Sequence, residues 1–407
     1  MIIPAGKRLV HSLTERGTLV TRLRGIISSL TFQVLAIAIV TRLGLAFANW
    51  FSLRVLPRLQ FYDSQRPDWF LPRTPALDGW ARWDSAHYIN VALNGYGLDD
   101  PEQMGQRVAF FPLYPLLTRA VATVTGAEET NAGYAIAAII AANICFFIAV
   151  PLFAKLVTRL SSVEVARIAT TLLLISPLAF FLNAAYTESL FLLLSILAFL
   201  FAYDQKWLPA SIAIALASAT RLFGLALIPA ILLIAWRKGA SLRELAMIVI
   251  VSPLCTVAFF GWLWREYGDP FTYFDAQSNW GTWQDRVGTY LDVLTGQPGQ
   301  MLANNQYTII LVNVVLAVIW LVALYWVWRH LEPGIALYTT LIVVFHFAYT
   351  WNSLGRYLLP ALGVYIVGAM LLTRPGWNTW VRESVYLGSA IALTLLTILF
   401  SHGFWIV

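Results

Sequence analysis

The residues with the greatest chemical potential lie in one short polar motif, Arg82-Trp83-Asp84-Ser85-Ala86-His87-Tyr88. It places a guanidinium, a carboxylate and an imidazole within seven residues, beside two aromatic rings. Burial of such a group in lipid would cost on the order of several kcal/mol per charge, so we expect the motif in a loop or a water-filled cavity. A positioned carboxylate can take a proton from a reacting hydroxyl, which contributes roughly 10²–10⁴-fold to rate. We therefore predict that Asp84 is a catalytic base.

Three further polar segments fall at junctions between predicted helices: residues 185–189, residues 220–224 and residues 351–357, the last preceded by His346. The predicted topology brings all of them to the membrane face that carries Asp84. Arginines at that face suit a phosphate, because their fork binds oxygens in pairs and stays charged. Together with aromatic rings that stack on sugars, they fit a sugar leaving a lipid phosphate. The candidate substrate-binding residues are Arg82, Trp83, His87, Tyr88, Glu188, Arg221, His346 and Arg356.

The composition indicates a polytopic membrane protein. The chain has 407 residues, of which 59% are hydrophobic and only 12% charged, whereas a soluble domain carries about 25% charged residues. The net charge of +6 does not indicate a nucleic-acid partner, since the basic residues are scattered at predicted helix ends. Both cysteines fall in apolar runs, so we expect no structural disulfide. The first apolar stretch is too long for a cleaved signal peptide and is expected to remain as a helix.

The hydrophobic pattern predicts a single all-α integral membrane domain over residues 1–407, with about eleven transmembrane helices. A first helix at 26–50 leads to a long outer loop at 51–130, which carries the Asp84 motif and amphipathic helices lying at the interface. Helices follow over 131–264, then a second outer loop at 265–305 and C-terminal helices over 306–404. The individual helices are expected at 131–157, 166–185, 187–203, 207–221, 222–236, 244–264, 306–328, 334–351, 355–372 and 383–404.

The distribution of charge orients this layout. The lysines of the chain all fall on the predicted inner side, as do the basic residues of the tail over 1–25, and most acidic residues fall in the two outer loops. This is the positive-inside pattern. It predicts a cytoplasmic N-terminus and places the Asp84 motif on the outer face. The lysines are Lys7, Lys155, Lys206 and Lys238.

Several of these motifs resemble one family. Trp83-Asp84-x-x-His87-Tyr88, followed by Gly95-Tyr96 and by Phe110-Phe111-Pro112-x-Tyr114-Pro115, is similar to the start of the PIG-V mannosyltransferases, the GPI mannosyltransferase 2 family and its bacterial relatives. Residues 185–191 match a second block. Residues 219–224 are similar to a third, in which the family often has Asn where this chain has Phe223. The matches span about residues 80–225, with a looser similarity at 267–270.

The resemblance implies a GT-C-type fold and an inverting glycosyltransferase. Its donor would be polyprenyl- or dolichyl-phosphate mannose, its acceptor a lipid or a glycan, and its base the aspartate of the first outer loop, which is Asp84 here. The chain has no N-x-[ST] sequon and no recognisable ER-retrieval tail. A bacterial inner membrane is therefore favoured, with the ER membrane as the location in a eukaryote.

Structural alternatives remain for most of these residues. Asp84 would pair with Arg82 or cap a helix, and His87 would hold the loop together by hydrogen bonding. Glu188 would cap a helix or pair with an arginine. Arg221 and Arg356 would extend to the headgroup level as anchors, and His346 would be a core histidine.

The sequence predicts no cofactor and no metal ligand, with arginines in place of a cation. There is no D-x-D motif, and the acidic cluster Asp99-Asp100-Pro101-Glu102 is interpreted as a solvated turn, a divalent cation there being the alternative. Two rival functions are a transporter or flippase for a lipid-linked sugar and a non-catalytic subunit of a glycosylation complex. Transporters usually carry internal repeats, and this chain shows none.

Overall fold

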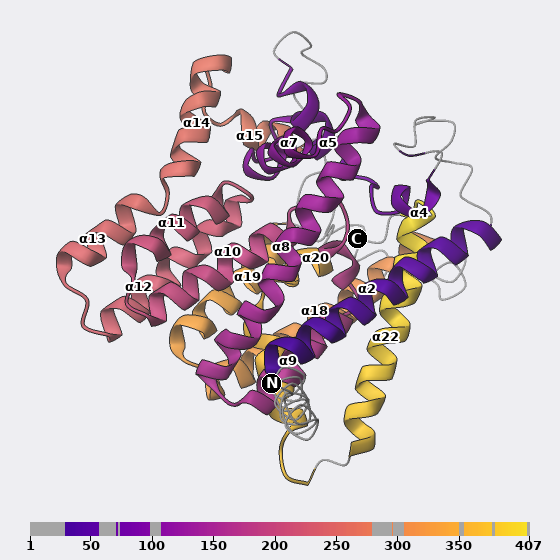
Figure 1. The fold of residues 1–407 in the computed structure, drawn as a ribbon. Coiled ribbons are helices and arrows are strands. Elements are labelled where there is room, and N and C mark those ends of the chain that lie inside the picture. Colours follow the sequence, from indigo (N-terminus) through magenta and orange to yellow (C-terminus); the bar gives the residue numbers. More distant parts are fainter. Residues whose placement is uncertain are drawn as a thin grey trace, which may run out of the picture.

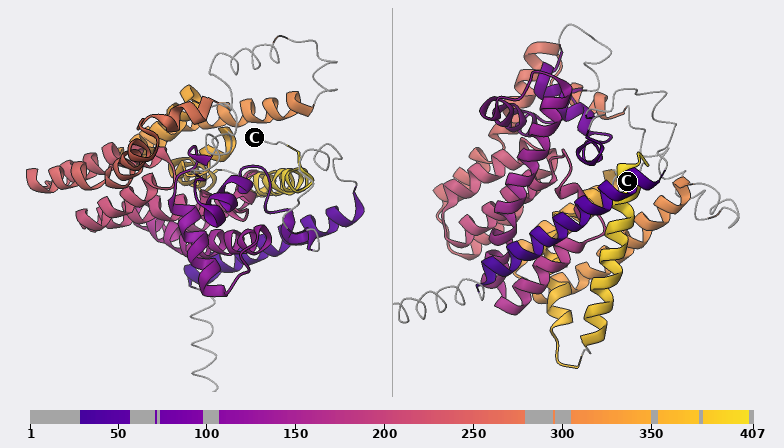
Figure 2. Two further views of the ribbon diagram at one scale, coloured as in Figure 1. Left: turned by 90° about the horizontal axis from the view of Figure 1, so that it is seen from above. Right: turned by 45° about the vertical axis from the view of Figure 1, so that its right-hand side comes forward.

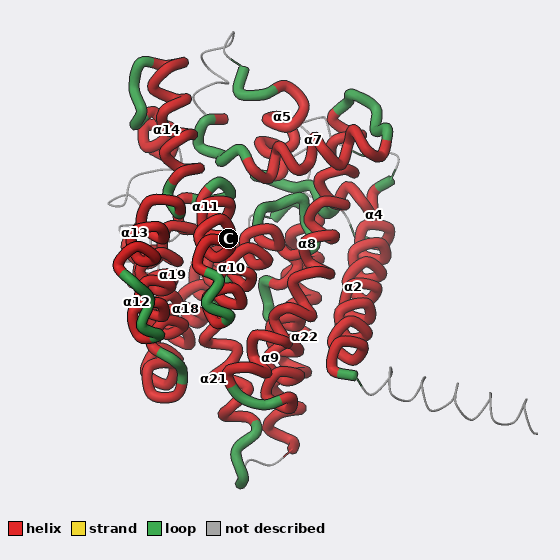
Figure 3. The backbone as a smooth tube through the Cα atoms, turned by 60° about the vertical axis from the view of Figure 1, so that its left-hand side comes forward, coloured by secondary structure: helices red, strands yellow, loops and turns green. Residues whose placement is uncertain are grey.

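The computed structural model describes residues 29–56, 71, 74–97, 107–278, 295, 305–349, 354–376 and 379–404. Within these ranges every regular element is a helix and none is a strand (Figures 1 and 3). The predicted all-α fold class is therefore confirmed. The elements are α2 (Leu30–Val55), α4 (Pro75–Asp78), α5 (Ser85–Asn94), α7 (Leu113–Thr125), α8 (Asn131–Leu160), α9 (Val163–Ile175), η1 (Ala179–Leu182), α10 (Glu188–Tyr203), α11 (Trp207–Ser218), η2 (Leu222–Ala226), α12 (Leu227–Arg237), α13 (Leu242–Val251), α14 (Leu254–Tyr267), α15 (Thr272–Ser278), α18 (Asn305–His330), α19 (Pro333–Tyr349), α20 (Leu354–Leu358), α21 (Leu362–Leu372) and α22 (Thr379–Ser401).

Four helices in these ranges are long and apolar enough to cross a membrane: Leu30–Val55, Asn131–Leu160, Leu242–Tyr267 and Thr379–Ser401. Shorter apolar helices accompany them, and the chain is an integral membrane protein. The number of spans and the side faced by the N-terminus remain predictions, and the basic tail over 1–25 lies outside the described residues. The shorter apolar helices are Glu188–Tyr203, Trp207–Ser218, Leu222–Arg237, Val314–His330, Pro333–Phe347 and Leu362–Leu372.

The helix predicted at 166–185 is shorter than expected. α9 ends at Ile175, and α10 begins only at Glu188, with η1 and irregular backbone between them. The cause is Pro177, because a proline disfavours helical backbone at the residue before it. Ser176 accordingly has an extended ψ of 138°. The irregular segment 183–187 that results leads directly to Glu188.

A second interruption lies between α11 and α12. One predicted helix was expected to end at residue 221 and the next to begin at residue 222. α11 ends at Ser218, Arg221 has extended backbone (φ −158°, ψ 141°), and a 3₁₀ turn precedes α12. Arg221 therefore lies between two helices, at a position where the backbone is extended and not helical. Glu188 begins the helix that follows the first interruption, and Arg221 lies within the second.

The short helices of the first loop form a layer over one end of α8 (Figure 1), where α5, α7 and α8 contact one another. α7 begins directly after Pro112 and is too short to cross a bilayer, in keeping with the predicted interfacial helix. Hydrogen bonds hold it to its neighbours: the Tyr114 hydroxyl donates to the Ala138 carbonyl of α8 (2.8 Å), and Arg119 Nε donates to the Ala92 carbonyl of α5 (2.7 Å). The layer is thereby fixed to the helical bundle.

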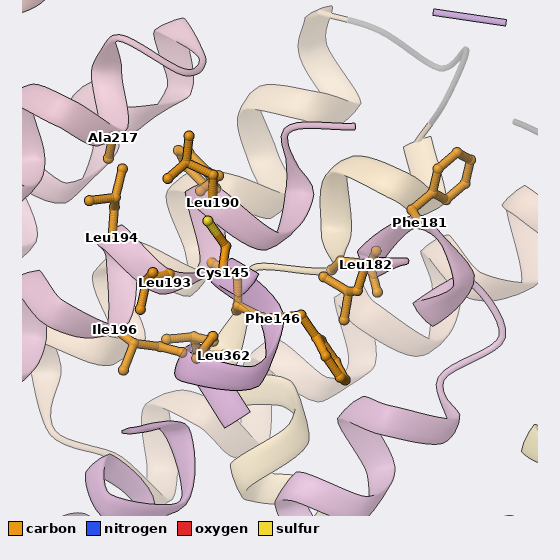
Figure 4. Close-up of a cluster of buried hydrophobic side chains, with 14 of the residues drawn as sticks. Cys145, Phe146, Phe181, Leu182, Leu190, Leu193, Leu194, Ile196, Ala217 and Leu362 are labelled. Atoms are coloured by element: carbon orange, nitrogen blue, oxygen red, sulfur yellow. The ribbon is translucent and has the colours of Figure 1, made fainter. Parts of the chain in front are cut away.

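Apolar side chains of α8 and α10 form the core below this layer (Figure 4). Cys145 lies among leucines of α10, and its thiol is buried and unpaired. Cys255 is also unpaired, so the prediction of no disulfide is confirmed. Small residues on α8, including Ala138 and Ala142, are fully buried and allow neighbouring helices to approach closely.

Helix α22 packs beside α2, and its C-terminal end lies near the loop that precedes α5 (Figure 2). Arg82 Nε donates to the Ser401 carbonyl at 3.2 Å, and Trp83 Nε1 donates to the Phe404 carbonyl at 3.2 Å. These hydrogen bonds join the loop before α5 to the C-terminal end of α22, more than three hundred positions away in the sequence.

Gly224 is the residue of η2 that packs most closely on α11. A Cβ at this position would meet the backbone of Ala217 and Ser218, which cannot move aside as a flexible side chain would. Overpacking of this kind typically costs about 1–3 kcal/mol. We therefore expect Gly224→Ala to lower the thermal unfolding temperature of the detergent-solubilised protein.

Gly261→Ala in α14 is the matched control, because nothing lies within 4 Å of a Cβ there. Its unfolding temperature should stay unchanged or rise slightly, since alanine favours helix. An equal loss in both variants would contradict the close packing of η2 on α11.

Candidate active site

Two irregular segments meet beside the loop that carries Asp84. The Ala185 amide donates to the Trp80 carbonyl at 2.9 Å, and the Tyr186 hydroxyl donates to the Arg82 carbonyl at 2.9 Å. From the other side, the Leu113 amide donates to the Ala219 carbonyl at 3.0 Å. Backbone contacts thus join the first loop to both helix interruptions.

Asp84 precedes the first residue of α5, yet its side chain makes no capping hydrogen bond. Its Oδ2 instead accepts a hydrogen bond from Arg356 Nη1 at 2.8 Å, across 272 positions of sequence. The interpretation of Asp84 as a helix cap is therefore wrong. The carboxylate is held by an arginine of α20, a helix predicted only as the start of the span at 355–372.

Asp84, Arg356, Glu188 and Arg221 form a continuous line of alternating charges, which we call the four-ion array. Arg356 Nε lies 3.2 Å from Glu188 Oε1, and Arg221 Nη2 donates to the same oxygen. Arg221 Nε also donates to Thr187 Oγ1 at 2.5 Å. The exposed fractions of the four residues are between 2% and 9%. The array is therefore buried and electrically balanced.

This arrangement decides two of the structural alternatives. Arg221 and Arg356 are buried against carboxylates, so neither is a headgroup anchor. Glu188 pairs with both arginines, as one of its alternatives proposed. Pairing alone does not exclude a role in substrate binding, because guanidinium groups held in place are suited to receive an anion.

Tyr357 and His346 border the array on its arginine side. Arg356 Nη2 donates to the Tyr357 hydroxyl at 2.7 Å, and the guanidinium carbons of Arg356 and Arg221 lie 4.6 and 5.1 Å from the Tyr357 ring centroid. The His346 ring stacks on Tyr357 at 4.8 Å, and its Nδ1 lies 2.6 Å from the Ile342 carbonyl. Since a carbonyl only accepts, Nδ1 carries the proton, and Nε2 is left as a buried acceptor with no hydrogen bond in the described part of the chain.

Tyr88 and His87 lie on the carboxylate side, in α5. The Tyr88 ring packs edge-on against three other rings at 5.0 to 6.2 Å. Burial raises the pKa of its hydroxyl, while the guanidinium groups of the array lower it and the carboxylates raise it by smaller amounts. The phenol is therefore a neutral donor at physiological pH. The His87 ring stacks on Phe110 at 4.6 Å with an interplanar angle of 14°.

Arg82 and Trp83 hold the loop rather than complete the array. Arg82 Nη2 lies 2.7 Å from Asp78 Oδ2, and Arg82 Nη1 donates to the Asp78 carbonyl. Trp83 has a left-handed backbone (φ 57°), which disfavours any residue with a Cβ, and its indole bonds to the Phe404 carbonyl. These contacts favour a positioning role for both residues over the predicted substrate contact.

The sequence-based prediction missed several residues that complete the site. Asp78 precedes Arg82 by four positions, a spacing typical of ion pairs, and was a visible signal. Thr187, Tyr357 and the carbonyls of residues 401–404 had no signal of their own. Residues 351–353 and the acidic cluster at 99–102 lie outside the described residues. In the parts that are described, no three His, Cys, Asp or Glu side chains gather as metal ligands.

Comparison with protein families identifies a match over the part of the chain that contains Asp84, Glu188 and Arg221. The sequence model of the family described as Mannosyltransferase (PIG-V) matches residues 73–258. The resemblance predicted from the motifs is therefore confirmed, and it supports a glycosyltransferase enzyme. Arg356 and His346 lie beyond the matched range. Comparison with curated proteins finds no match.

Solved structures support the fold. The oligosaccharyltransferase of Archaeoglobus fulgidus, in complex with zinc and sulfate, is 14% identical with a TM-score of 0.50 over 92% of this chain and 53% of that protein. Its apo form is 15% identical with a TM-score of 0.50 over 91% and 56%. The chain thus spans about half the length of that GT-C enzyme, and the predicted GT-C-type fold is confirmed. ArnT from Cupriavidus metallidurans, bound to undecaprenyl phosphate, is 14% identical with a TM-score of 0.48 over 83% and 76%.

The array predicts a strong dependence of stability on Arg356. Replacement by glutamine leaves two buried carboxylates with Arg221 as the one cation of the array, and breaking a buried pair in this way costs roughly 3–5 kcal/mol. We expect Arg356→Gln to lower the thermal unfolding temperature in detergent by a large margin.

Arg159→Gln is the comparison variant, since it breaks the Arg159–Asp204 pair, in which each side chain is 35% exposed. Solvent screens that pair, so the unfolding temperature should change little. Similar losses in the two variants would show that the four-ion array is not a buried unit.

Proposed function

Since residues 73–258 match the PIG-V mannosyltransferase family on a GT-C-type fold, we propose that the chain transfers mannose from a polyprenyl- or dolichyl-phosphate donor to a lipid-linked or glycan acceptor. Transfer occurs with inversion at the outer face of a bacterial inner membrane, and the N-terminus is cytoplasmic. The observation that carries the proposal is the four-ion array, which joins a carboxylate to two arginines beside aromatic rings.

Asp84 is the base in this reaction. Arg356 donates to Oδ2 and orients the carboxylate, while Oδ1 has no hydrogen bond within the described structure. Oδ1 accepts the proton of the acceptor hydroxyl. The acceptor oxygen then forms its bond to the anomeric carbon on the face opposite the phosphate, which gives inversion.

Arg221 and Arg356 act on the leaving group. As the bond between the anomeric carbon and the phosphate oxygen breaks, that oxygen keeps the electron pair and negative charge develops on the phosphate. Guanidinium groups held in a buried site stabilise this charge more than water does. The products are the mannosylated acceptor and a polyprenyl or dolichyl phosphate.

Tyr88 and His346 supply the remaining polar groups. The neutral Tyr88 hydroxyl donates to a substrate oxygen, and His346 Nε2 accepts from a substrate hydroxyl. The rival functions, a lipid-linked-sugar transporter and a non-catalytic subunit, are not favoured by any of these contacts. The family match favours the enzyme.

The first test is mannosyl transfer in proteoliposomes from synthetic polyprenyl-phosphate mannose, with a cell lipid extract as the acceptor pool. We expect Asp84→Asn to lower the transfer rate by roughly 10²–10⁴-fold, because the amide keeps the shape but takes no proton. Asp204→Asn, at the distant Arg159 pair, should match the wild type. Transfer by Asp84→Asn at the wild-type rate would show that Asp84 is not the base.

The second test concerns metal dependence. The arginines take the place of a cation in this proposal, so EDTA added to the same assay should leave the initial rate unchanged. The readout is the rate before and after chelation and after return of Mg²⁺ or Mn²⁺. Loss of transfer with EDTA and recovery with either ion would contradict the proposal of a metal-independent reaction.

A further inference from the structure

Glu188 has an unusual position for a carboxylate. A single oxygen, Oε1, lies between Arg356 and Arg221, whereas Oε2 is buried and has no hydrogen-bond partner among the described residues. Carboxylates that serve only to hold arginines commonly use both oxygens. One oxygen shared by two guanidinium groups is the geometry that a phosphate oxygen would adopt between the same arginines.

The start of α10 adds to this geometry. Glu188 lies in the first turn of a 16-residue helix, where free amides and the helix dipole favour an anion. The residue that would normally cap the helix, Thr187, makes no capping bond and accepts from Arg221 Nε instead. The helix end and both arginines therefore favour negative charge at the same place.

The charge of the array sets a limit on substrate binding. Two carboxylates and two guanidinium groups already balance, so a phosphate that entered without any rearrangement would add uncompensated charge to a buried site. Release of one carboxylate from the arginines removes this penalty. Of the two arginines of the array, Asp84 pairs with Arg356 alone, while Glu188 pairs with both, so Glu188 occupies the position between the arginines that a phosphate would take.

We propose that Glu188 is an exchangeable placeholder anion, which occupies the phosphate position between Arg221 and Arg356 in the unliganded protein and is displaced when the lipid phosphate binds. The inference rests on the proposed function, since the lipid phosphate is its ligand. While the site is vacant, Glu188 keeps both arginines ordered and their charge compensated. Binding of the phosphate breaks the contacts of Oε1 and replaces them with contacts of a phosphate oxygen.

The exchange also assists product release. The donor is a phosphodiester, whereas the product is a phosphomonoester that carries more negative charge and binds two arginines more tightly. Return of Glu188 to the arginines replaces the contacts that the product loses as it leaves. Glu188 thus lowers the affinity of the site for the product phosphate, so that the product leaves and the next donor can bind.

The test measures binding of undecaprenyl phosphate to the full-length protein in nanodiscs. We expect Glu188→Gln to lower the Kd by about tenfold, within the range of one charge-assisted hydrogen bond. Asp84→Asn is the matched control: it removes the same charge from the same array but leaves Oε1 between the arginines. Because it also removes one negative charge, its Kd should fall, but by much less than the Kd of Glu188→Gln. Glu188→Asp, which keeps the charge on a shorter side chain, should have an intermediate Kd.

Two results would overturn the inference. Equal tightening by Glu188→Gln and Asp84→Asn would mean that net charge alone controls binding. Weaker binding by Glu188→Gln in a protein that retains the wild-type unfolding temperature would mean that Glu188 organises the arginines for phosphate instead of competing with it. If neither the wild type nor Glu188→Gln binds undecaprenyl phosphate, exchange with a lipid phosphate is likewise wrong.

A kinetic measurement separates this inference from the proposed function. In the transfer assay, undecaprenyl phosphate should inhibit Glu188→Gln at about tenfold lower concentration than the wild type, with KM for the donor and kcat both reduced. Absence of transfer by a wild type that binds the lipid would contradict the proposed function alone. Normal transfer with unchanged product inhibition in Glu188→Gln would contradict the exchange alone.

Discussion

Burial of four full charges at one point is the constraint on which the rest of the structure depends. Each member of the array is at least nine-tenths buried, and a charge removed from water is tolerated only where an opposite charge or hydrogen bonds take the place of the water. The four residues belong to separate parts of the chain, so their pairing joins the first loop, both helix interruptions and α20. The contacts that we propose for phosphate binding therefore also hold separate parts of the fold together.

The two helix interruptions make this array possible inside an apolar bundle. Irregular backbone within a membrane protein is tolerated where it is covered by protein or lines a wet cavity, and here each interruption forms a backbone hydrogen bond with the first loop. Ala185 bonds to Trp80, and Leu113 bonds to Ala219. The four charges are buried within the protein, where their interaction is stronger than in water.

Local features of this site were predictable from the sequence, and long-range pairings were not. The Asp84 motif, the polar junctions and the short interfacial helix carry local signals, and they led to the family that the comparison confirms. Pro177 also indicated that α9 ends early. The helix was nevertheless predicted to continue to residue 185, because the apolar run extends past the proline. The partner of Asp84 lies 272 positions away, and no pattern around either residue specifies that contact. The contact of Arg82 with Ser401 was unpredictable for the same reason, because the two residues lie 319 positions apart.

The attachment of the first loop to the end of α22 has a consequence for biogenesis. Trp83 adopts a left-handed backbone next to Asp84, and its indole is bonded to Phe404. A ribosome makes Phe404 more than three hundred residues after Trp83. Until that late segment has been inserted, the loop lacks the contact that offsets its unfavourable conformation. The contacts of this loop with Ser401 and Phe404 therefore form only after the last helix has been made, late in the synthesis of the chain.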